Sequence, residues 1–392
     1  MKRFSAQYIF TGTGEVLKRG IITTDDDGRV TGIEDTGGRL TERASTRFYN
    51  GIIVPGFVNS HCHLELSHLR GRIGRHTGLG GFVRGVREAR LTADDDAEQV
   101  IAGADSTMYR SGISVCGDIC NSSITFGIKE QSPLAYVNFL EVFGIDPHRA
   151  DRRMDELRQL QREASAFSTP SWVVPHSFYS LSATLLKRVN EAATHNEVST
   201  VHFMESPTER DLLQHAGGAL MDSYRAMGIE EDDLSDRIPS HEEGLRHHIT
   251  PSGRLILVHN TFASAGDIRL AMQRPDVFFC LCPASNLYIE NKLPPADLLY
   301  SAGAEIVMGT DSLASNEALD ILSELKILSA AFPGIPFGEM LRWCTLNGAK
   351  ALGMDNEYGS IEKGKKPGLV LIENVDLDGM NLLDDSRSRR LI

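Results

Sequence analysis

Residues 52–63 read IIVPGFVNSHCH, an apolar run that ends in two histidines one residue apart. The run is short and β-rich, so we expect a buried strand over Ile52–Val58. Side chains two residues apart on an extended backbone point to the same side, so His61 and His63 share one space. The sequence therefore predicts a strand that presents two imidazoles together at its carboxyl end.

The same rhythm, a short apolar run followed by a polar or helical stretch, recurs through the middle of the chain. It is typical of βα units and a parallel sheet. The predicted strands are Ile52–Val58, Ile113–Asp118, Ala135–Val142, Trp172–Pro175, Ser199–Phe203, Leu255–His259, Val277–Cys282 and Glu305–Met308. Helices are predicted over Phe82–Arg90, Met154–Ala166, Ala183–Thr194, Asp267–Arg274 and Ala318–Ala331. Eight such units predict an α/β fold, a (β/α)8 or TIM barrel.

The two ends of the chain depart from this rhythm. Residues 1–52 hold short β-like pieces between glycine and aspartate turns, and Gly359–Ile372 reads GSIEKGKKPGLVLI, a turn and a strand. We therefore expect both ends, residues 1–52 and 357–392, to build one small β-sandwich-like domain, with the barrel of residues 53–356 inserted into it. The long, charged segment Gly217–Pro251 is predicted to cover the barrel mouth and contribute to substrate selectivity.

Composition excludes several classes of protein. The formal net charge of -13 over 392 residues disfavours a nucleic-acid partner, because such proteins usually carry a basic surface. No apolar run approaches the roughly 20 residues that span a bilayer, so we expect no membrane association and a cytoplasmic location. The cysteines lack a framework spacing and are predicted to be reduced core residues: Cys62, Cys116, Cys120, Cys280, Cys282 and Cys344.

Polar residues that can bind metal follow several of the predicted strands, where the active sites of barrel enzymes lie. They are His61 and His63 after strand one, His176 after strand four, His202 and Glu205 after strand five, His259 after strand six and Asp311 after strand eight. His202 and Asp311 would join the histidine pair in a mixed nitrogen and oxygen shell around one divalent metal. Such a shell leaves a position for water, whose pKa the cation lowers toward about 7. The pattern predicts a metal-dependent hydrolase.

Roles follow from these positions. Asp311 is predicted to be both a metal ligand and the general base, and Glu205 to carry a proton to the substrate. His259 is predicted to hydrogen-bond the attacking water or the developing oxyanion. Trp172 and Phe178 are predicted to stack on a flat substrate and His176 to bind its polar edge. The remaining histidines are expected at the surface or in loops: His68, His76, His148, His195, His215, His241, His247 and His248.

Several motifs resemble those of the amidohydrolase superfamily and its deaminase branch. They are PGFVNSHCHLELS from Pro55, HFMES from His202, LVHNTF from Leu257, LCPASNLYIEN from Leu281 and GTDSLASN from Gly309. The closing segment from Gly359 is also similar, although Gly368 stands where that branch commonly has an aspartate. The resemblance spans nearly the whole chain. Within the branch, the motifs look closest to aminodeoxyfutalosine deaminases, and methylthioadenosine and S-adenosylhomocysteine deaminases are also similar.

The resemblance implies a single metal, zinc or else iron, held by His61, His63, His202 and Asp311. Members with two metals carry a carboxylated lysine after strand four, where this chain reads VVPHSFYS from Val173. His176 matches a substrate-contacting histidine of the single-metal members. Asn286 and Ser315, which lie inside two of the motifs, are added as candidate substrate contacts. A homodimer is implied by the resemblance alone.

The implied reaction is hydrolytic removal of an exocyclic amine from a purine-type nucleoside or related heterocycle, with release of ammonia. Two alternatives stay open. The same metal site serves hydrolysis of a cyclic amide or a carbon–halogen bond in related proteins. A barrel of this kind can also survive as a non-catalytic small-molecule-binding protein, although such relatives generally lose metal ligands.

Overall fold

The computed structural model describes residues 1–14, 16–39, 43–92, 96–249 and 253–392. Two parallel sheets of four strands make the middle of the chain, in the orders β6-β7-β8-β9 and β10-β11-β12-β13. The strands are β6 (Phe57–Cys62), β7 (Ile113–Cys120), β8 (Ala135–Val142), β9 (Ser171–Pro175), β10 (Val198–Phe203), β11 (Arg254–His259), β12 (Val277–Leu281) and β13 (Glu305–Met308). The predicted α/β fold with eight barrel strands is confirmed.

The two sheets meet at two seams, which close the barrel near the carboxyl ends of the strands. At one seam Cys62 forms a parallel bridge with Asp311, and at the other Ser177 forms one with His202. The His61 carbonyl accepts hydrogen bonds from the backbone N–H groups of Thr310 and Asp311, at 3.0 and 3.1 Å. Residues predicted to bind metal therefore also close the barrel.

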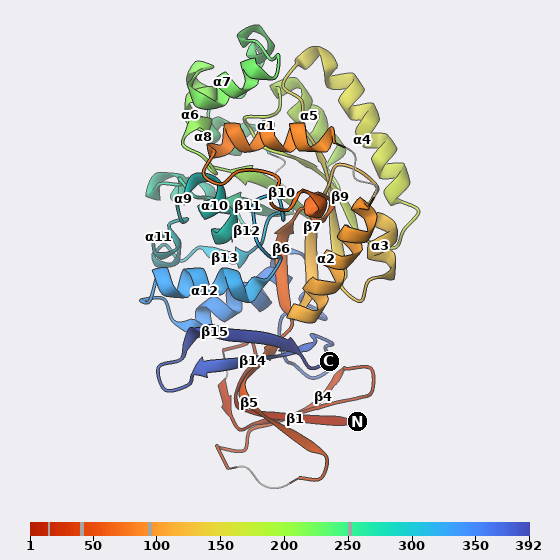
Figure 1. The fold of residues 1–392 in the computed structure, drawn as a ribbon, viewed down its shortest axis with the longest axis vertical. Helices are drawn as coiled ribbons and strands as arrows, with labels where there is room; N and C mark the ends of the chain where they lie inside the picture. The colour runs from red at the N-terminus through yellow and green to blue at the C-terminus, as the bar shows by residue number, and fades with distance from the viewer. Residues whose placement is uncertain (15, 40–42, 93–95, 250–252) are drawn as a thin grey trace.

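Helices surround the barrel (Figure 1). They are α1 (Gly78–Arg90), α2 (Ala97–Ser111), α3 (Phe126–Gln131), α4 (Ala150–Ala164), α5 (Ala183–Ala192), α6 (Thr208–His215), α7 (Gly218–Ala226), α8 (His241–His247), α9 (Ala265–Ala271), α10 (Pro283–Glu290), α11 (Ala296–Ser301), α12 (Ile321–Ala331), α13 (Phe337–Arg342) and α14 (Gly348–Ala351). The barrel interior is apolar: Val115, Val137, Val174 and Val258 belong to one buried cluster, which also includes Ala349 of α14. In the described part of the chain, every helix is too short or too polar to span a bilayer.

Both chain ends build one seven-stranded sheet, as predicted, and it lies at the opposite end of the barrel from α1 and α7 (Figure 1). Its strands are β1 (Lys2–Phe10), β2 (Val16–Lys18), β3 (Ile21–Thr24), β4 (Val30–Glu34), β5 (Thr46–Pro55), β14 (Leu369–Asp376) and β15 (Asn381–Arg390). β5 lies between β1 and β14, so the start and the end of the chain are hydrogen-bonded to the same strand.

The expected strand over Ile52–Val58 is divided between the two parts of the molecule. Gly56 separates β5, in the small sheet, from β6, in the barrel. A Cβ atom on Gly56 would lie 1.9 Å from Ser114 Oγ and 2.6 Å from the Pro367 carbonyl oxygen. The chain therefore needs glycine where it crosses from one sheet to the other.

The segment predicted to cover the mouth folds mainly as helices. Residues 217–249 form α7, a 3₁₀ turn at Glu231–Leu234 and α8, and residues 250–252 at its end lie outside the described residues. α7 packs beside α1, where a Cβ on Gly80 would lie 2.4 Å from Ser223 Oγ. All six cysteines are buried and free, as predicted.

Candidate metal centre

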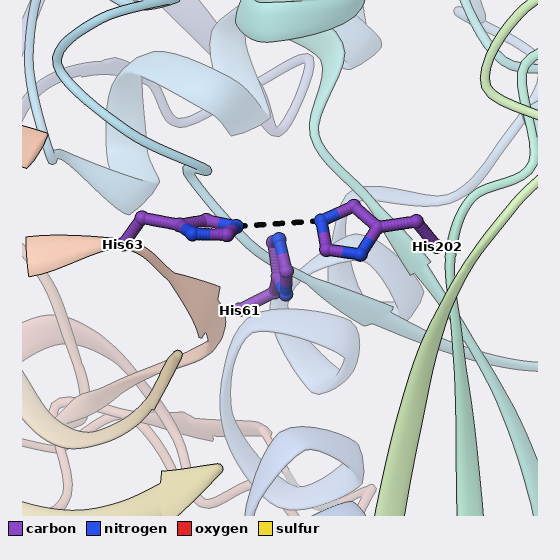
Figure 2. Close-up of side chains that lie close together, drawn as sticks. All are labelled: His61, His63 and His202. Carbon is purple, nitrogen blue, oxygen red and sulfur yellow. Dashed lines mark hydrogen bonds between the residues drawn. The ribbon is translucent and has the colours of Figure 1, made fainter. Parts of the chain in front are cut away.

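Three imidazoles converge at the carboxyl end of the barrel. His61 ends β6 with Cys62, His63 follows that strand, and His202 lies in β10. Nε2 of His63 lies 3.3 Å from Nε2 of His202, and the His61 ring lies 4.9 Å from each of the other two rings, centroid to centroid (Figure 2). All three side chains are buried. The structure thus brings together three of the four predicted metal ligands around one point.

Asp311 supplies the fourth group. Its Oδ1 lies 3.6 Å from His63 Nε2 and 3.9 Å from His61 Nε2. Its Oδ2 points away and accepts hydrogen bonds from Ser285 Oγ at 2.6 Å and Ser315 Oγ at 2.8 Å. These two hydroxyls hold the carboxylate with one oxygen facing the histidines. Ser315, expected as a substrate contact, supports Asp311 in this way.

The protonation states of these groups fit a divalent cation. Nδ1 of His202 lies 3.0 Å from the carbonyl oxygen of His176, which can only accept, so the proton sits on Nδ1 and the Nε2 lone pair faces the centre. Burial, together with neighbouring histidines, holds the pKa of His61 and of His63 well below the usual value, so both imidazoles are neutral. Both ring nitrogens of His61 are buried without a hydrogen-bond partner. Neutral imidazole with a free lone pair is the form that binds metal.

The pKa values of two carboxyl groups in the site are shifted in opposite directions. Burial raises the pKa of Glu205 well above its usual value, and the negative charges of Asp311 and Glu209 raise it further. Burial acts against ionisation of Asp311 too, but His259, His61 and the Ser285 hydroxyl outweigh it, and the pKa of Asp311 is lowered. The two shifts favour the protonated form of Glu205, which suits a proton donor, and the ionised form of Asp311, which suits a proton acceptor.

His259 lies beside Glu205, at the end of β11. Its Nε2 is 3.6 Å from Glu205 Oε1, and its Nδ1 accepts a hydrogen bond of 3.0 Å from the Asn286 side-chain nitrogen. Burial lowers the pKa of His259 to about 3, so the ring is neutral and carries its proton on Nε2, toward the site. His259 and Asp311 both have left-handed backbones, with φ of 76° and 56°. Non-glycine residues held there are strained, as is common at functional sites.

The expected substrate-binding residues are spread more widely than predicted. The His176 ring stacks on that of His202 at 4.4 Å between centroids, and its Nδ1 contacts the Ser180 hydroxyl at 2.8 Å. Asn286 is fully buried behind His259. Trp172 and Phe178 lie outside the cluster. Trp172 is near the amino end of β9 and packs on the barrel core, and Phe178 is buried between Phe203 and His241.

Two groups near the site were not among the predicted residues. Glu141, in β8, places Oε1 3.6 Å from His202 Nδ1, and burial raises its pKa to about 8. It is the last residue but one of the predicted strand three, so the rule would have found it if applied to the carboxyl-terminal residues inside each strand. His241, expected at the surface or in a loop, is buried and contacts Glu209. No local signal marks it, because its partner lies 32 residues away in the chain.

The chain is similar to known proteins in sequence and in fold. Adenosine deaminase of Helicobacter pylori is 27% identical over 336 residues, which cover 82% of this chain and 79% of that protein. The crystal structure of Helicobacter pylori aminofutalosine deaminase in complex with methylthio-coformycin has a TM-score of 0.77 at 21% identity and covers 96% of this chain and 93% of that chain. Atrazine chlorohydrolase from Arthrobacter aurescens, complexed with zinc, has a TM-score of 0.70 at 17% identity and covers 98% of this chain and 90% of that chain. The amidohydrolase family pattern matches residues 52–386, and the chain is a member of the amidohydrolase family.

Proposed function

We propose that this chain is a metal-dependent aminohydrolase, which removes the exocyclic amine of a purine-type nucleoside or related heterocycle and releases ammonia. The observation that carries the proposal is a pair of buried carboxyls: Glu205 lies 3.6 Å from His259, Asp311 faces His61 and His63, and their pKa values are shifted in opposite directions. Deamination of a ring needs an acid at the ring nitrogen and a base at the attacking water, and this pair offers both.

His61, His63, His202 and Asp311 would hold one divalent cation, which we propose to be zinc, with iron as the alternative. When bound, the cation lowers the pKa of a water molecule and so supplies a nucleophile at neutral pH. Zinc is supported by the three neutral imidazoles and one carboxylate, a ligand set that suits that ion.

The side chains divide the proton transfers between them. Asp311 Oδ1 accepts a proton from the attacking water, because Oδ2 is engaged by two hydroxyls. Glu205 donates its proton to the ring nitrogen next to the carbon under attack. The Nε2–H group of His259 donates a hydrogen bond to the oxygen that develops negative charge. Asp311 then returns its proton to the leaving amine. As ammonia leaves and the carbonyl forms, the remaining hydroxyl proton is released to solvent, and Glu205 regains a proton from solvent. We propose that His176, stacked beside His202, contacts the substrate's polar edge.

A panel of compounds tests the reaction. Zinc-loaded protein would be incubated with adenosine, 5'-deoxyadenosine, 5'-methylthioadenosine, S-adenosylhomocysteine, guanine, cytosine, aminotriazines and a chlorotriazine. Ammonia release and product mass would be measured for each. We expect ammonia from at least one adenosine derivative, in keeping with the name of the 27% identical relative. Chloride release or ring opening without ammonia would support the carbon–halogen or cyclic-amide alternative. Binding without turnover of any compound would support the non-catalytic one.

Removal of the metal is expected to abolish activity and lower stability together. A chelator should stop ammonia release, and stoichiometric zinc should restore it. A ligand that binds only the folded state at about 100 times its Kd adds about 2.7 kcal/mol, so the melting temperature should fall on chelation. Activity and melting temperature would be followed against metal content. Full activity in protein shown by elemental analysis to be metal-free would contradict the proposal.

Asn286→Asp is expected to damage the site more than Asn286→Ala. An aspartate would accept a proton from Nδ1 of His259, so the ring would lose its proton on Nε2, the nitrogen that faces Glu205. Alanine removes the hydrogen bond that Asn286 donates to Nδ1, but it does not favour the opposite tautomer of His259. Partners of this kind typically contribute about 10- to 100-fold, so we expect a loss of about 10-fold for alanine and about 100-fold for aspartate. Steady-state kcat/KM would be compared at equal metal content. Equal losses would show that Asn286 does not set the tautomer.

A further inference from the structure

A second buried pair, Glu209 and His241, lies behind Glu205. His241 Nε2 is 2.8 Å from Glu209 Oε2, and the two side chains are 5% and 1% exposed. Glu209 is in α6, just after the loop that carries Glu205, whereas His241 begins α8, at the far end of the α7–α8 segment (residues 217–249). The pair therefore joins this segment to the loop of the proposed acid.

Glu209 binds the backbone on both sides of Glu205. Its Oε2 accepts a hydrogen bond from Met204 N at 3.2 Å, and its Oε1 accepts one from Ser206 N at 2.9 Å. Met204 has a left-handed backbone, with φ of 51°, and its carbonyl accepts a hydrogen bond from Phe262 N at 2.9 Å. A strained turn of this kind persists only where its surroundings fix it. One carboxylate thus binds the backbone N–H groups of both residues that flank the acid.

The position of His241 is itself fixed by packing. Its ring lies 5.3 Å from that of Phe203 and 6.2 Å from that of Phe178, both edge to face. Ser240 caps α8 by accepting a hydrogen bond from Glu243 N. A Cβ on Gly244 would lie 2.6 Å from the Phe178 ring, so glycine lets the helix approach. These contacts surround the imidazole while its Nε2 lies against the carboxylate.

A carboxylate near the start of a helix often binds exposed N–H groups there, and that alone would make Glu209 a helix cap. Capping does not account for the buried partner of Glu209, His241 from α8. A cap needs no histidine, and a buried imidazole contacting a buried carboxylate is costly unless each satisfies the other. Glu209 also lies close enough to Glu205 for its negative charge to favour the protonated acid.

We propose that His241 and Glu209 are positioning residues for proton transfer: the pair fixes the turn that carries Glu205 and makes the placement of that acid depend on the α7–α8 segment. The inference rests on the proposed function, in which Glu205 is the acid. Its structural part, the anchoring of the turn, does not depend on any substrate.

Three variants and a control test the proposal. His241→Leu fills the space between the aromatic rings but cannot donate. In Glu209→Gln, the side-chain NH2 group faces one of the two backbone N–H groups that donate to the carboxylate, so two donors meet. His241→Gln keeps a donor at the end of a side chain of similar reach. The control is Tyr136→Phe, which removes a buried 2.6 Å hydrogen bond to Asp105, between β8 and α2. This control loses one buried hydrogen bond, as the test variants do, but at a place away from the site.

Kinetics with the best substrate of the panel give the first readout. We expect His241→Leu and Glu209→Gln to lower kcat about 10- to 100-fold, with KM changed less than about 3-fold and zinc content unchanged. His241→Gln should recover most of kcat. Tyr136→Phe should lower the melting temperature and leave kcat as it is. A His241→Leu enzyme with normal kcat, or a Tyr136→Phe enzyme with the same loss, would overturn the proposal.

Hydrogen exchange gives a readout that needs no activity. Exchange at the amides of Met204 and Ser206 should become at least 10-fold faster in His241→Leu and Glu209→Gln, and stay unchanged in Tyr136→Phe. If the parent released no ammonia from any compound, the proposed function would fail, while these amides would still report on the anchor. Unchanged exchange in both variants would overturn the anchor whatever the reaction. If either His241→Leu or Glu209→Gln does not fold, the other variant serves for both readouts. His241→Gln, whose side chain is of similar size, is the further check.

Discussion

Asp311→Asn is expected to lower kcat/KM for deamination by about 10⁴-fold, the largest effect of any single substitution proposed for this chain. Asparagine keeps the shape of the side chain, and the hydroxyls of Ser285 and Ser315 can still contact it. It has neither the negative charge nor the basic oxygen that faces His61 and His63. The variant therefore loses the base and weakens the metal site at once. Single-turnover ammonia release at saturating zinc measures the loss.

The matched variant for Asp311 is Ser315→Ala. It removes one of the two hydrogen bonds to Oδ2 and leaves the carboxylate charged. We expect a loss of about 10-fold, because Ser285 still orients the group. Metal content and melting temperature would be recorded for both variants. If Asp311→Asn retained more than a tenth of the parent's activity at full zinc occupancy, Asp311 would not be the base.

Glu205→Gln is expected to lower kcat about 10²- to 10⁴-fold, the range of general acid–base catalysis. It is also expected to change the pH dependence. Burial raises the pKa of Glu205, and the protonated form is the active one. Activity of the parent should therefore be present below that raised pKa and fall as pH rises through it. Glutamine cannot ionise, so this alkaline decline should be missing from the variant's profile of kcat/KM against pH.

Glu141→Gln controls for another buried carboxyl beside the candidate metal ligands, whose pKa is raised to about 8. Glu141 contacts His202 and the Asn121 amide rather than Glu205 or His259. We expect the alkaline decline to remain in this variant. Its disappearance in Glu141→Gln, with its persistence in Glu205→Gln, would transfer the role of acid to Glu141.

Much of the fold could be predicted because barrel strands are short apolar runs separated by helical stretches. Strand four, predicted over Trp172–Pro175, runs over Ser171–Pro175. The division at Gly56 could not be predicted, since the apolar run continues across it. Only the approach of Ser114 and Pro367, which are remote in the chain, makes the break.

The metal centre could be predicted from one rule, that chemistry collects at the carboxyl ends of barrel strands. The rule fails for Trp172, which lies near the amino end of its strand, and for Phe178, which lies beyond its strand and packs against His241 of α8. Their aromatic character says nothing about position along a strand. The Glu209–His241 pair is harder still, because it depends on where α8 packs after a long segment.

A metal ion at the proposed site would link the two sheets of the barrel. His61 and His63 come from the sheet of β6–β9, whereas His202 and Asp311 lie in or directly after the sheet of β10–β13. A cation held by all four would fasten one half of the barrel to the other. Lack of metal would then lower the stability of the protein as well as its activity. The two halves of the barrel would separate more easily, and proteases would degrade the chain. We expect its abundance in a cell to follow metal supply.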